Sequence, residues 1–159
     1  MKINDTIPHV SLDPRVCPSG DEKVQLFALL VETNARLERT LNLELESACG
    51  LPLAWFAVLL TLRQAPDERL KMNQVADAIV HSTGGTTRLI DRLEESGLVV
   101  RQACAGDRRA IYVALTELGG ARLDEALAVH LSYLETHLAG RLSASERATL
   151  ASLLEKLNA

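Results

Sequence analysis

The stretch that decides the fold is STGGTTRLIDRLEESGLVVRQACAGDRRAIYVALT, residues 82–116. Its first half carries apolar residues at three- and four-residue steps, which predicts a helix over residues 83–96. Gly97 follows at the position where a glycine commonly ends a helix. The period then changes to that of strands, because residues 98–103 and 111–115 are rich in β-formers and are separated by a polar, basic loop. The stretch therefore predicts a helix followed by a β-hairpin.

Around this stretch the apolar spacing predicts mostly helices. We expect a long helix that starts at a capping box formed by Ser19 and Glu22 and runs to about residue 49. Further helices are expected at residues 52–64, 72–80 and 117–139, and a last one starts at a second capping box formed by Ser143 and Glu146. Two short adjacent helices, joined by a tight turn and followed by a hairpin, make a winged helix-turn-helix. The predicted fold is mainly α: a winged helix-turn-helix with a two-stranded β-wing, flanked by long N- and C-terminal dimerisation helices.

The chain divides by expected role into three regions. Residues 1–20 hold three prolines and little periodicity, so we expect an N-terminal arm there. Residues 21–50 and 116–159 form the expected helical dimerisation region, because a long apolar stripe in so small a protein needs a second copy to cover it. Residues 51–115 form the expected winged helix-turn-helix DNA-binding region.

Composition supports a helical protein and restricts where positive charge can gather. Of 159 residues, 47% are hydrophobic and 3% aromatic, and the net charge is −4. The stretch from Lys71 to Ala110 has a net charge of +1, so it is the part where a basic surface could form. The longest apolar run, residues 51–62, is too short to span a bilayer, and the N-terminus has no apolar leader. We therefore expect a cytoplasmic protein.

The helix at residues 83–96 has the features of a DNA-reading helix. With its apolar residues turned inward, small hydroxyl residues and arginines face outward or lie at the margins of that face. Small residues allow a helix to approach the major groove closely, and Arg88 can reach guanine or phosphate. An ordinary amphipathic helix with a solvated Thr/Arg face remains the alternative at this point. The candidate major-groove residues are Ser82, Thr83, Thr86, Thr87, Arg88 and Arg92.

The tip of the predicted hairpin is the second candidate DNA contact. It carries Asp107, Arg108 and Arg109 after a glycine. Arginine suits a narrow minor groove, where the electrostatic potential is most negative. Asp107 would pair with an arginine and hold the shape of the turn. A charged, solvated turn is the simpler alternative for the tip alone, but the helix and the hairpin in this order favour DNA binding.

The residues quoted above carry a family resemblance. Val75-Ala76, the block at residues 87–99, and Asp107-Arg108-Arg109 followed by residues 113–116 resemble the MarR family (multiple antibiotic resistance regulators), over about residues 22–157. The resemblance implies an obligate homodimer that binds a double-stranded DNA operator, usually as a repressor. It also implies Arg109 as the minor-groove residue and a small phenolic or aromatic effector, or an oxidant, that weakens DNA binding.

Two departures from the family pattern accompany the resemblance. Lys71 stands where the family usually has a Ser or Thr cap, so the cap of the helix at residues 72–80 should be weaker or displaced. Residues 1–20 have no counterpart in a minimal member of the family. The effector pocket of the family lies between the dimer helices and the winged helix-turn-helix region, which we call the reading head. The candidate effector residues are Asn34, Arg36, Trp55 and Phe56.

Cysteines leave a second regulatory mechanism open. Cys17 lies just ahead of the first helix, and Cys104 lies in the wing among arginines, which favour a reactive thiolate. Unreactive, reduced thiols are the simpler interpretation, since no CxxC pair is present. A third interpretation is a helical interaction module that has lost DNA binding.

No metal, cofactor or enzymatic activity is expected. His130 and His137 lie about 10 Å apart along one helix, which is too far for both to bind one ion. The sequence contains no GxSxG, P-loop or dinucleotide fingerprint.

Overall fold

The structure, a computed structural model, describes residues 21–79, 83–104 and 107–158, and for residues 83–84, 104 and 107–110 it describes the backbone alone. The chain separates into two compact units, Met1–Leu37 and Glu38–Ala159. The predicted arm at residues 1–20, together with Ser82 and Cys17, lies outside the described residues.

The first unit holds the start of helix α1 (Glu22–Cys49), which ends at the predicted residue. It begins after Asp21 rather than directly after Ser19, and Ser19 of the predicted capping box lies outside the described residues. The carboxylate of Asp21 accepts a hydrogen bond from the backbone N–H of Lys23 at 2.9 Å, which satisfies one of the unpaired donors at the helix start. The large apolar side chains in this part of α1 are exposed: Leu26, Phe27, Leu29, Leu30 and Val31.

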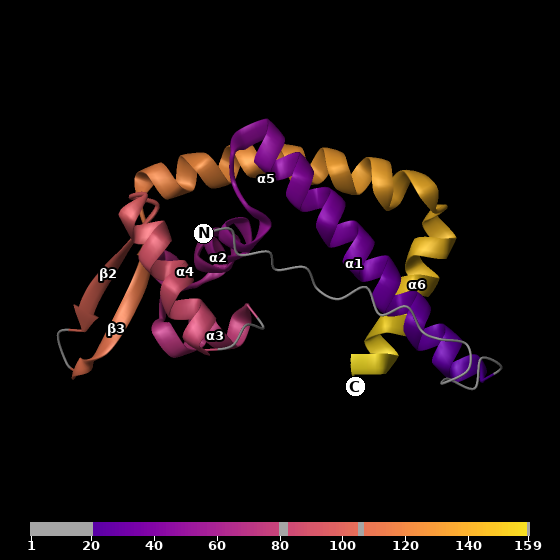
Figure 1. Cartoon of the computed structure of the whole chain (residues 1–159), viewed down its shortest axis with the longest axis horizontal. Coiled ribbons are helices and arrows are strands. Elements are labelled where there is room, and N and C mark those ends of the chain that lie inside the picture. The colour runs from indigo at the N-terminus through magenta and orange to yellow at the C-terminus, as the bar shows by residue number, and fades with distance from the viewer. Residues whose placement is uncertain (1–20, 80–82, 105–106, 159) are drawn as a thin grey trace, which may run out of the picture. The chain divides into compact units, whose positions relative to one another are not determined.

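The second unit holds the end of α1 and the remaining elements (Figure 1). Its helices are α2 (Leu53–Gln64), α3 (Met72–Ala78), α4 (Thr83–Glu95), α5 (Glu117–His137) and α6 (Ala144–Asn158), with short 3-10 turns η1 (Pro66–Glu68) and η2 (Ala139–Arg141). Its strands are β1 (Arg69–Lys71), β2 (Val99–Cys104) and β3 (Asp107–Leu115). The order of helices and hairpin agrees with the predicted winged helix-turn-helix.

The sheet has one strand more than the predicted two-stranded wing. β3 pairs antiparallel with β2 on one side and with β1 on the other. Asp67 and Glu68, which precede β1, have positive φ angles of 53° and 51°. Strand β1 begins directly after them and is only three residues long. Hydrogen bonds to β3 rather than a periodic pattern make it a strand, because three residues are too few to show a period.

Leucine and valine side chains from several elements form the core of the second unit. α2 contributes Phe56, Val58, Leu59 and Leu62, and α4 contributes Ile90 and Leu93. Strands β2 and β3 add Val99 and Val113, and α5 adds Leu123 and Ala126. One apolar face of α4 is therefore fixed against the rest of the winged domain, and its opposite face determines what it can bind.

Caps and glycines fix how α5 and α6 begin. Thr116 accepts a hydrogen bond at its Oγ1 from the N–H of Gly119 at 3.0 Å. The capping box predicted at Ser143 and Glu146 is confirmed, since the Ser143 N–H donates to Glu146 at 2.8 Å and the Glu146 N–H donates to Ser143 Oγ at 3.3 Å. Gly97 ends α4 with φ of +72°, as predicted for a terminating glycine.

Within the described ranges, no single helix meets the length and hydropathy needed to cross a membrane. The consecutive helices α1 and α2 meet that criterion only when taken together, and they are bent by 85° at the break between them.

Candidate nucleic-acid interface

The outward face of α4 is polar and basic. Ile90 and Leu93 are fully buried, so the residues on the opposite side of the helix turn away from the core. Thr87, Arg88 and Arg92 are all exposed. No salt bridge joins either arginine to a carboxylate in the described part of the chain. A helix surface with one short hydroxyl side chain and two long cationic ones fits the width and the polar base edges of a DNA major groove.

One predicted contact residue lies in the core instead. Thr86 is only 1% exposed, so its hydroxyl cannot reach a base edge while α4 stays packed. Thr86, Ile90 and Leu93 follow the i, i+4, i+7 spacing of the buried stripe. We therefore remove Thr86 from the candidate contact set. Thr83 opens α4, where only its backbone is described, and Ser82 lies outside the described residues.

The wing is an antiparallel hairpin of β2 and β3 that lies beside α4 (Figure 1). The predicted tip residues Asp107, Arg108 and Arg109 fall at the start of β3, and Asp107 pairs with Cys104 across the hairpin. A register shift between Ala103 and Cys104 marks a bulge near the tip. β3 begins earlier than the predicted strand at 111–115. Only the backbone of these tip residues is described, so the roles of Asp107, Arg108 and Arg109 remain predictions.

Arg101 of β2 joins the wing to α4, a link that the sequence interpretation missed. Its Nη2 donates to Asp91 Oδ1 at 2.6 Å, and its Nη1 donates to Glu94 Oε2 at 2.5 Å. Its backbone N–H donates to Glu94 Oε1 at 2.8 Å. These bonds lower the pKa of Glu94, chiefly through the backbone N–H of Arg101. Two carboxylates therefore offset the charge of Arg101, and the exposed cations of α4 are Arg88 and Arg92.

A second basic cluster lies on the other face of the sheet. Lys71 of β1 is directly opposite Tyr112 of β3, and Arg69 lies two residues earlier on the same face of β1. The Arg69 guanidinium carbon is 5.4 Å from the Tyr112 ring centre and Lys71 Nζ is 6.0 Å from it, which are cation–π distances. Arg69 also pairs with Asp67 at 3.1 Å. These contacts hold the exposed edge strand β1 against the sheet.

The start of α3 shows what Lys71 does in place of a Ser or Thr cap. A lysine ammonium has no acceptor, so its side chain cannot bind the first N–H groups of the helix. Gln74 supplies the other half of a capping box, since its Oε1 accepts from the Lys71 N–H at 2.9 Å. The predicted weaker cap is therefore observed as a half-made capping box.

The four predicted effector residues fall in different units. Asn34 and Arg36 are exposed on α1 in the first unit. In the second unit Trp55 is half-buried, and Phe56 is buried with its ring edge-to-face against His130 at 4.9 Å between centres. Burial lowers the pKa of His130 below its ordinary value, so the neutral imidazole is favoured there. Their role as an effector pocket remains a prediction.

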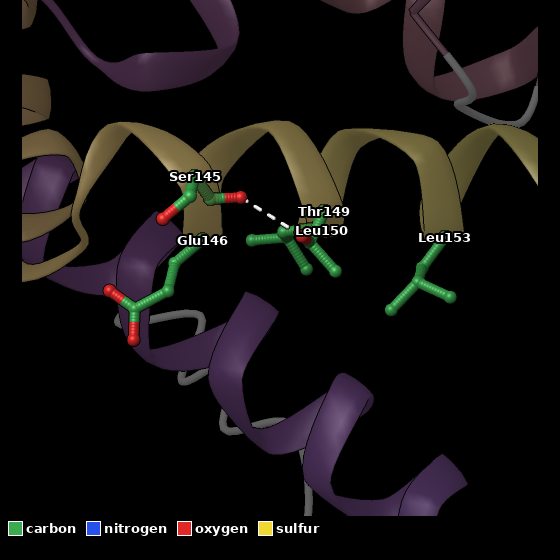
Figure 2. A pocket seen from close by; sticks show the side chains of 5 residues that line it. All are labelled: Ser145, Glu146, Thr149, Leu150 and Leu153. Atoms are coloured by element: carbon green, nitrogen blue, oxygen red, sulfur yellow. Dashed lines mark hydrogen bonds between the residues drawn. The ribbon is translucent and has the colours of Figure 1, made fainter.

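A shallow hollow lies elsewhere, along α6. Five side chains of that helix line it: Ser145, Glu146, Thr149, Leu150 and Leu153 (Figure 2). None of the predicted effector residues contributes to it. All five lining residues come from a single exposed helix, and Leu150 and Leu153 are 38% and 52% exposed, so the hollow is an open apolar face rather than an enclosed site.

The remaining candidates lead to no site in the described chain. The ring of His137 stacks on Tyr133 at 4.5 Å between centres, and its Nε2 lies 3.4 Å from Glu44 Oε1. Among the residues that the structure describes, no group of three His, Cys, Asp or Glu side chains could hold a metal ion. Cys49 is half-buried and donates its S–H to the Leu45 carbonyl at 3.1 Å. The side chain of Cys104 is not described, so its redox role remains untested.

Comparison with known proteins identifies the class of domain. The sequence model of the MarR family matches residues 50–110. The uncharacterised HTH-type transcriptional regulator YkoM of Bacillus subtilis is 33% identical over 86 residues, which are 54% of this chain and 55% of YkoM. The chain thus aligns with about half the length of that relative.

Solved structures extend the similarity over most of the chain. Wild-type MarR from E. coli is 31% identical, with a TM-score of 0.70 over 83% of this chain and 95% of MarR. A mutant E. coli MarR bound to operator DNA is 29% identical, with a TM-score of 0.76 over 92% and 97% of the two chains. BpsR of Bordetella bronchiseptica, whose DNA binding is regulated by 6-hydroxynicotinic acid, is 25% identical, with a TM-score of 0.74 over 85% and 99%.

Proposed function

This chain belongs to the MarR family of transcriptional regulators, which are DNA-binding proteins and not enzymes, and from that premise we propose that it acts as a homodimeric repressor. The dimer binds a two-fold symmetric operator in double-stranded DNA and releases it when a small aromatic effector binds. The target is cellular DNA, so the proposed site of action is the cytoplasm.

The observation that carries the proposal is the exposed face of α4. Thr87, Arg88 and Arg92 project from a helix whose other face is buried, and the hairpin wing stands beside that helix. In this arrangement a helix enters the major groove and reads base edges, while cations on it and near it neutralise phosphates. Arg109 is proposed to enter the adjacent minor groove, assisted by Arg108 and braced by Asp107.

Homodimerisation is supported by exposed apolar side chains at both ends of the chain. In the first unit, α1 exposes Phe27 at 70%. In the second unit, α6 exposes Leu153 at 52% and Leu157 at 68%. A soluble monomer rarely exposes runs of large apolar residues without a partner for them. A second copy would cover these helices and set two reading heads about 34 Å apart, one turn of DNA.

An aromatic acid is the proposed effector because a similar protein, BpsR, responds to 6-hydroxynicotinic acid. In the second unit, the half-buried Trp55 is the proposed ring to stack on the ligand, whereas Phe56 is buried against His130 and is not proposed to contact it. Asn34 and Arg36 of α1 remain predicted contacts for the polar groups of the ligand. Binding would act by favouring a dimer whose reading heads no longer match the operator spacing.

The proposal is tested by fluorescence anisotropy with the duplex upstream of the protein's own gene, titrated at several salt concentrations. We expect tighter binding to this duplex than to random duplex. The logarithm of the association constant should fall linearly with the logarithm of the salt concentration, with a slope of about 0.9 per phosphate neutralised. Adding 6-hydroxynicotinic acid should then weaken the binding. Weak binding that is equal for a library of genomic duplexes would contradict the proposal and favour an interaction module that has lost DNA binding.

A further inference from the structure

Arg101 binds α4 through three hydrogen bonds from one residue of β2. Both oxygens of Glu94 are used, one by the Arg101 backbone N–H and one by its guanidinium, and the second guanidinium nitrogen binds Asp91. The Arg101 side chain is 23% exposed. Asp91 and Glu94 are three residues apart on α4, where two like charges destabilise a helix unless a cation lies between them. Arg101 supplies that cation.

The residue type suits this task. A guanidinium is a planar fork with several donors in fixed directions, so one side chain can bind two carboxylates and hold both in place. A lysine in its place would offer a single point charge on a flexible chain. Replacing Arg101 by lysine should therefore keep the positive charge but disturb the geometry of the link to the two carboxylates.

The position of Arg101 along the wing explains why the contact matters for DNA reading. α4 and β2 are joined by the turn at residues 96–98, where the Leu98 N–H donates to the Leu93 carbonyl. The base of the hairpin is held by Val99 and Val113 in the core and by the pairing of β3 with β1. Arg101 lies three residues farther along β2, roughly 10 Å from Leu98. Its bonds to Asp91 and Glu94 add a direct polar attachment to α4 beyond Val99, which limits rotation of the wing against that helix.

We propose that Arg101 is a positioning residue: its bonds to Asp91 and Glu94 fix the angle between the wing and α4, so that both reach their grooves on the same stretch of DNA. This inference rests on the proposed function. It assigns specificity to a residue that does not itself contact DNA. Asp91 and Glu94 share that role, although they are acidic groups on a DNA-reading helix.

A direct phosphate contact by Arg101 is the competing role, and the two roles predict different results. Removing a phosphate contact weakens binding about equally for all sequences. Removing the link between the wing and α4 weakens binding to the preferred sequence more than to random DNA. The discrimination ratio, which is the dissociation constant for random DNA divided by that for the preferred sequence, therefore separates the two roles. General electrostatic changes affect both constants alike and leave this ratio unchanged.

The experiment compares four variants with the wild type: Arg101→Ala, Arg101→Lys, the double variant Asp91→Ala/Glu94→Ala, and the control Arg122→Ala. The probes are the duplex that the wild-type protein selects most strongly from a randomised library and a random duplex of equal length. The control removes an exposed arginine–glutamate pair on α5, Arg122 with Glu125 at 2.9 Å, and should leave the ratio unchanged. Circular dichroism at the assay temperature shows which variants are folded.

The inference predicts that Arg101→Ala lowers the ratio by about fivefold or more, the smallest effect of one lost base contact. The double variant should lower it as much, although it removes negative charge near the DNA, and Arg101→Lys should fall between. If the double variant keeps or raises the ratio while Arg101→Ala weakens both duplexes equally, Arg101 is a phosphate contact and the inference is overturned.

Failure of the proposed function looks different. If the wild-type protein selects no duplex over random DNA, the regulator proposal fails and the inference fails with it. If the wild type discriminates and all folded variants discriminate equally, only the inference fails. Should Arg101→Ala be unfolded, Arg101→Lys and the double variant decide the result by the same comparison.

Discussion

Two adjacent glycines at the start of α5 give an internally controlled test of how closely that helix approaches the reading head. Replacing Gly119 by alanine would place a Cβ 2.0 Å from the Leu98 carbonyl oxygen and 3.0 Å from Leu115 Cδ1. The carbonyl cannot turn away easily, because it accepts hydrogen bonds from the Thr116 N–H at 3.2 Å and the Thr116 hydroxyl at 3.0 Å. Gly119→Ala must therefore move α5 away from the strand that leads into the wing.

The expected magnitude follows from the balance of two effects. Forcing an extra methyl into a packed site costs about 1–3 kcal/mol, and a contact this far inside van der Waals distance falls at the upper end. Alanine also stabilises the folded helix by about 1 kcal/mol relative to glycine. The net loss in the free energy of unfolding is then about 2 kcal/mol, equivalent to a fall in Tm of roughly 4–8 °C for a chain of this size.

Gly120→Ala is the matched control. Its Cβ would lie 3.0 Å from Arg63 Nη2, the far end of a flexible side chain that can move. Alanine favours the helix over glycine, and this gain should roughly offset the cost of moving the Arg63 side chain and straining its hydrogen bond to the Gly120 carbonyl. The free energy of unfolding should therefore change by less than about 1 kcal/mol. Urea and thermal unfolding are measured at one protein concentration, since the stability of a dimer depends on it. Equal effects of the two substitutions would refute the close approach at Gly119.

Three further predictions concern binding, pH and assembly. Arg109→Ala should lose about tenfold or more in affinity for the selected duplex, consistent with one lost groove contact, while the protein stays dimeric in sedimentation; unchanged affinity would remove Arg109 from the wing contact. His130 has a pKa held below its ordinary value of 6.5 by burial, so the unfolded chain takes up the proton first and the free energy of unfolding should decline as the pH falls below 6.5. His130→Phe should lose that part of the decline in urea titrations at pH 7 and pH 5.5, and identical pH profiles would rule out His130 as its source. Leu153→Glu should shift the protein toward monomer in sedimentation by burying a charge in the proposed interface, whereas an unaltered dimer would mean that this face of α6 lies outside it.

The periodic pattern of the sequence predicted most of the fold. α1 ends at the predicted residue, and the helix-turn-helix followed by a hairpin is confirmed, because long runs with one buried face specify their own period. Strand β1 was missed because three residues show no period. β3 starts at Asp107 rather than at residue 111, since pairing near a hairpin tip depends on the partner strand and its bulge.

The candidate site was predicted less completely, for two reasons that can be named. Thr86 was chosen for its hydroxyl, although its spacing from Ile90 and Leu93 is that of the buried stripe, so the period was the better guide. Arg101 was counted as part of a basic stretch, but it is paired with Asp91 and Glu94. That pairing depends on the angle between a helix and a strand, which local sequence does not specify.

Other expectations remain predictions. The division into an arm, a dimerisation region and a reading head follows expected roles and is not the same as the two compact units. The roles of the wing residues Asp107, Arg108 and Arg109, and of the effector residues on α1 and α2, stay predictions.

The central claim is that α4 of each protomer lies in the major groove of one operator. Dimethyl sulfate footprinting tests it most directly, because the reagent methylates guanine N7 in the major groove, where a reading helix would block it. On the selected duplex we predict two segments of protected guanines, related by two-fold symmetry and centred about 10 base pairs apart, one helical turn. Bound duplex whose guanines stay fully reactive, or are protected in a single segment, would contradict the claim.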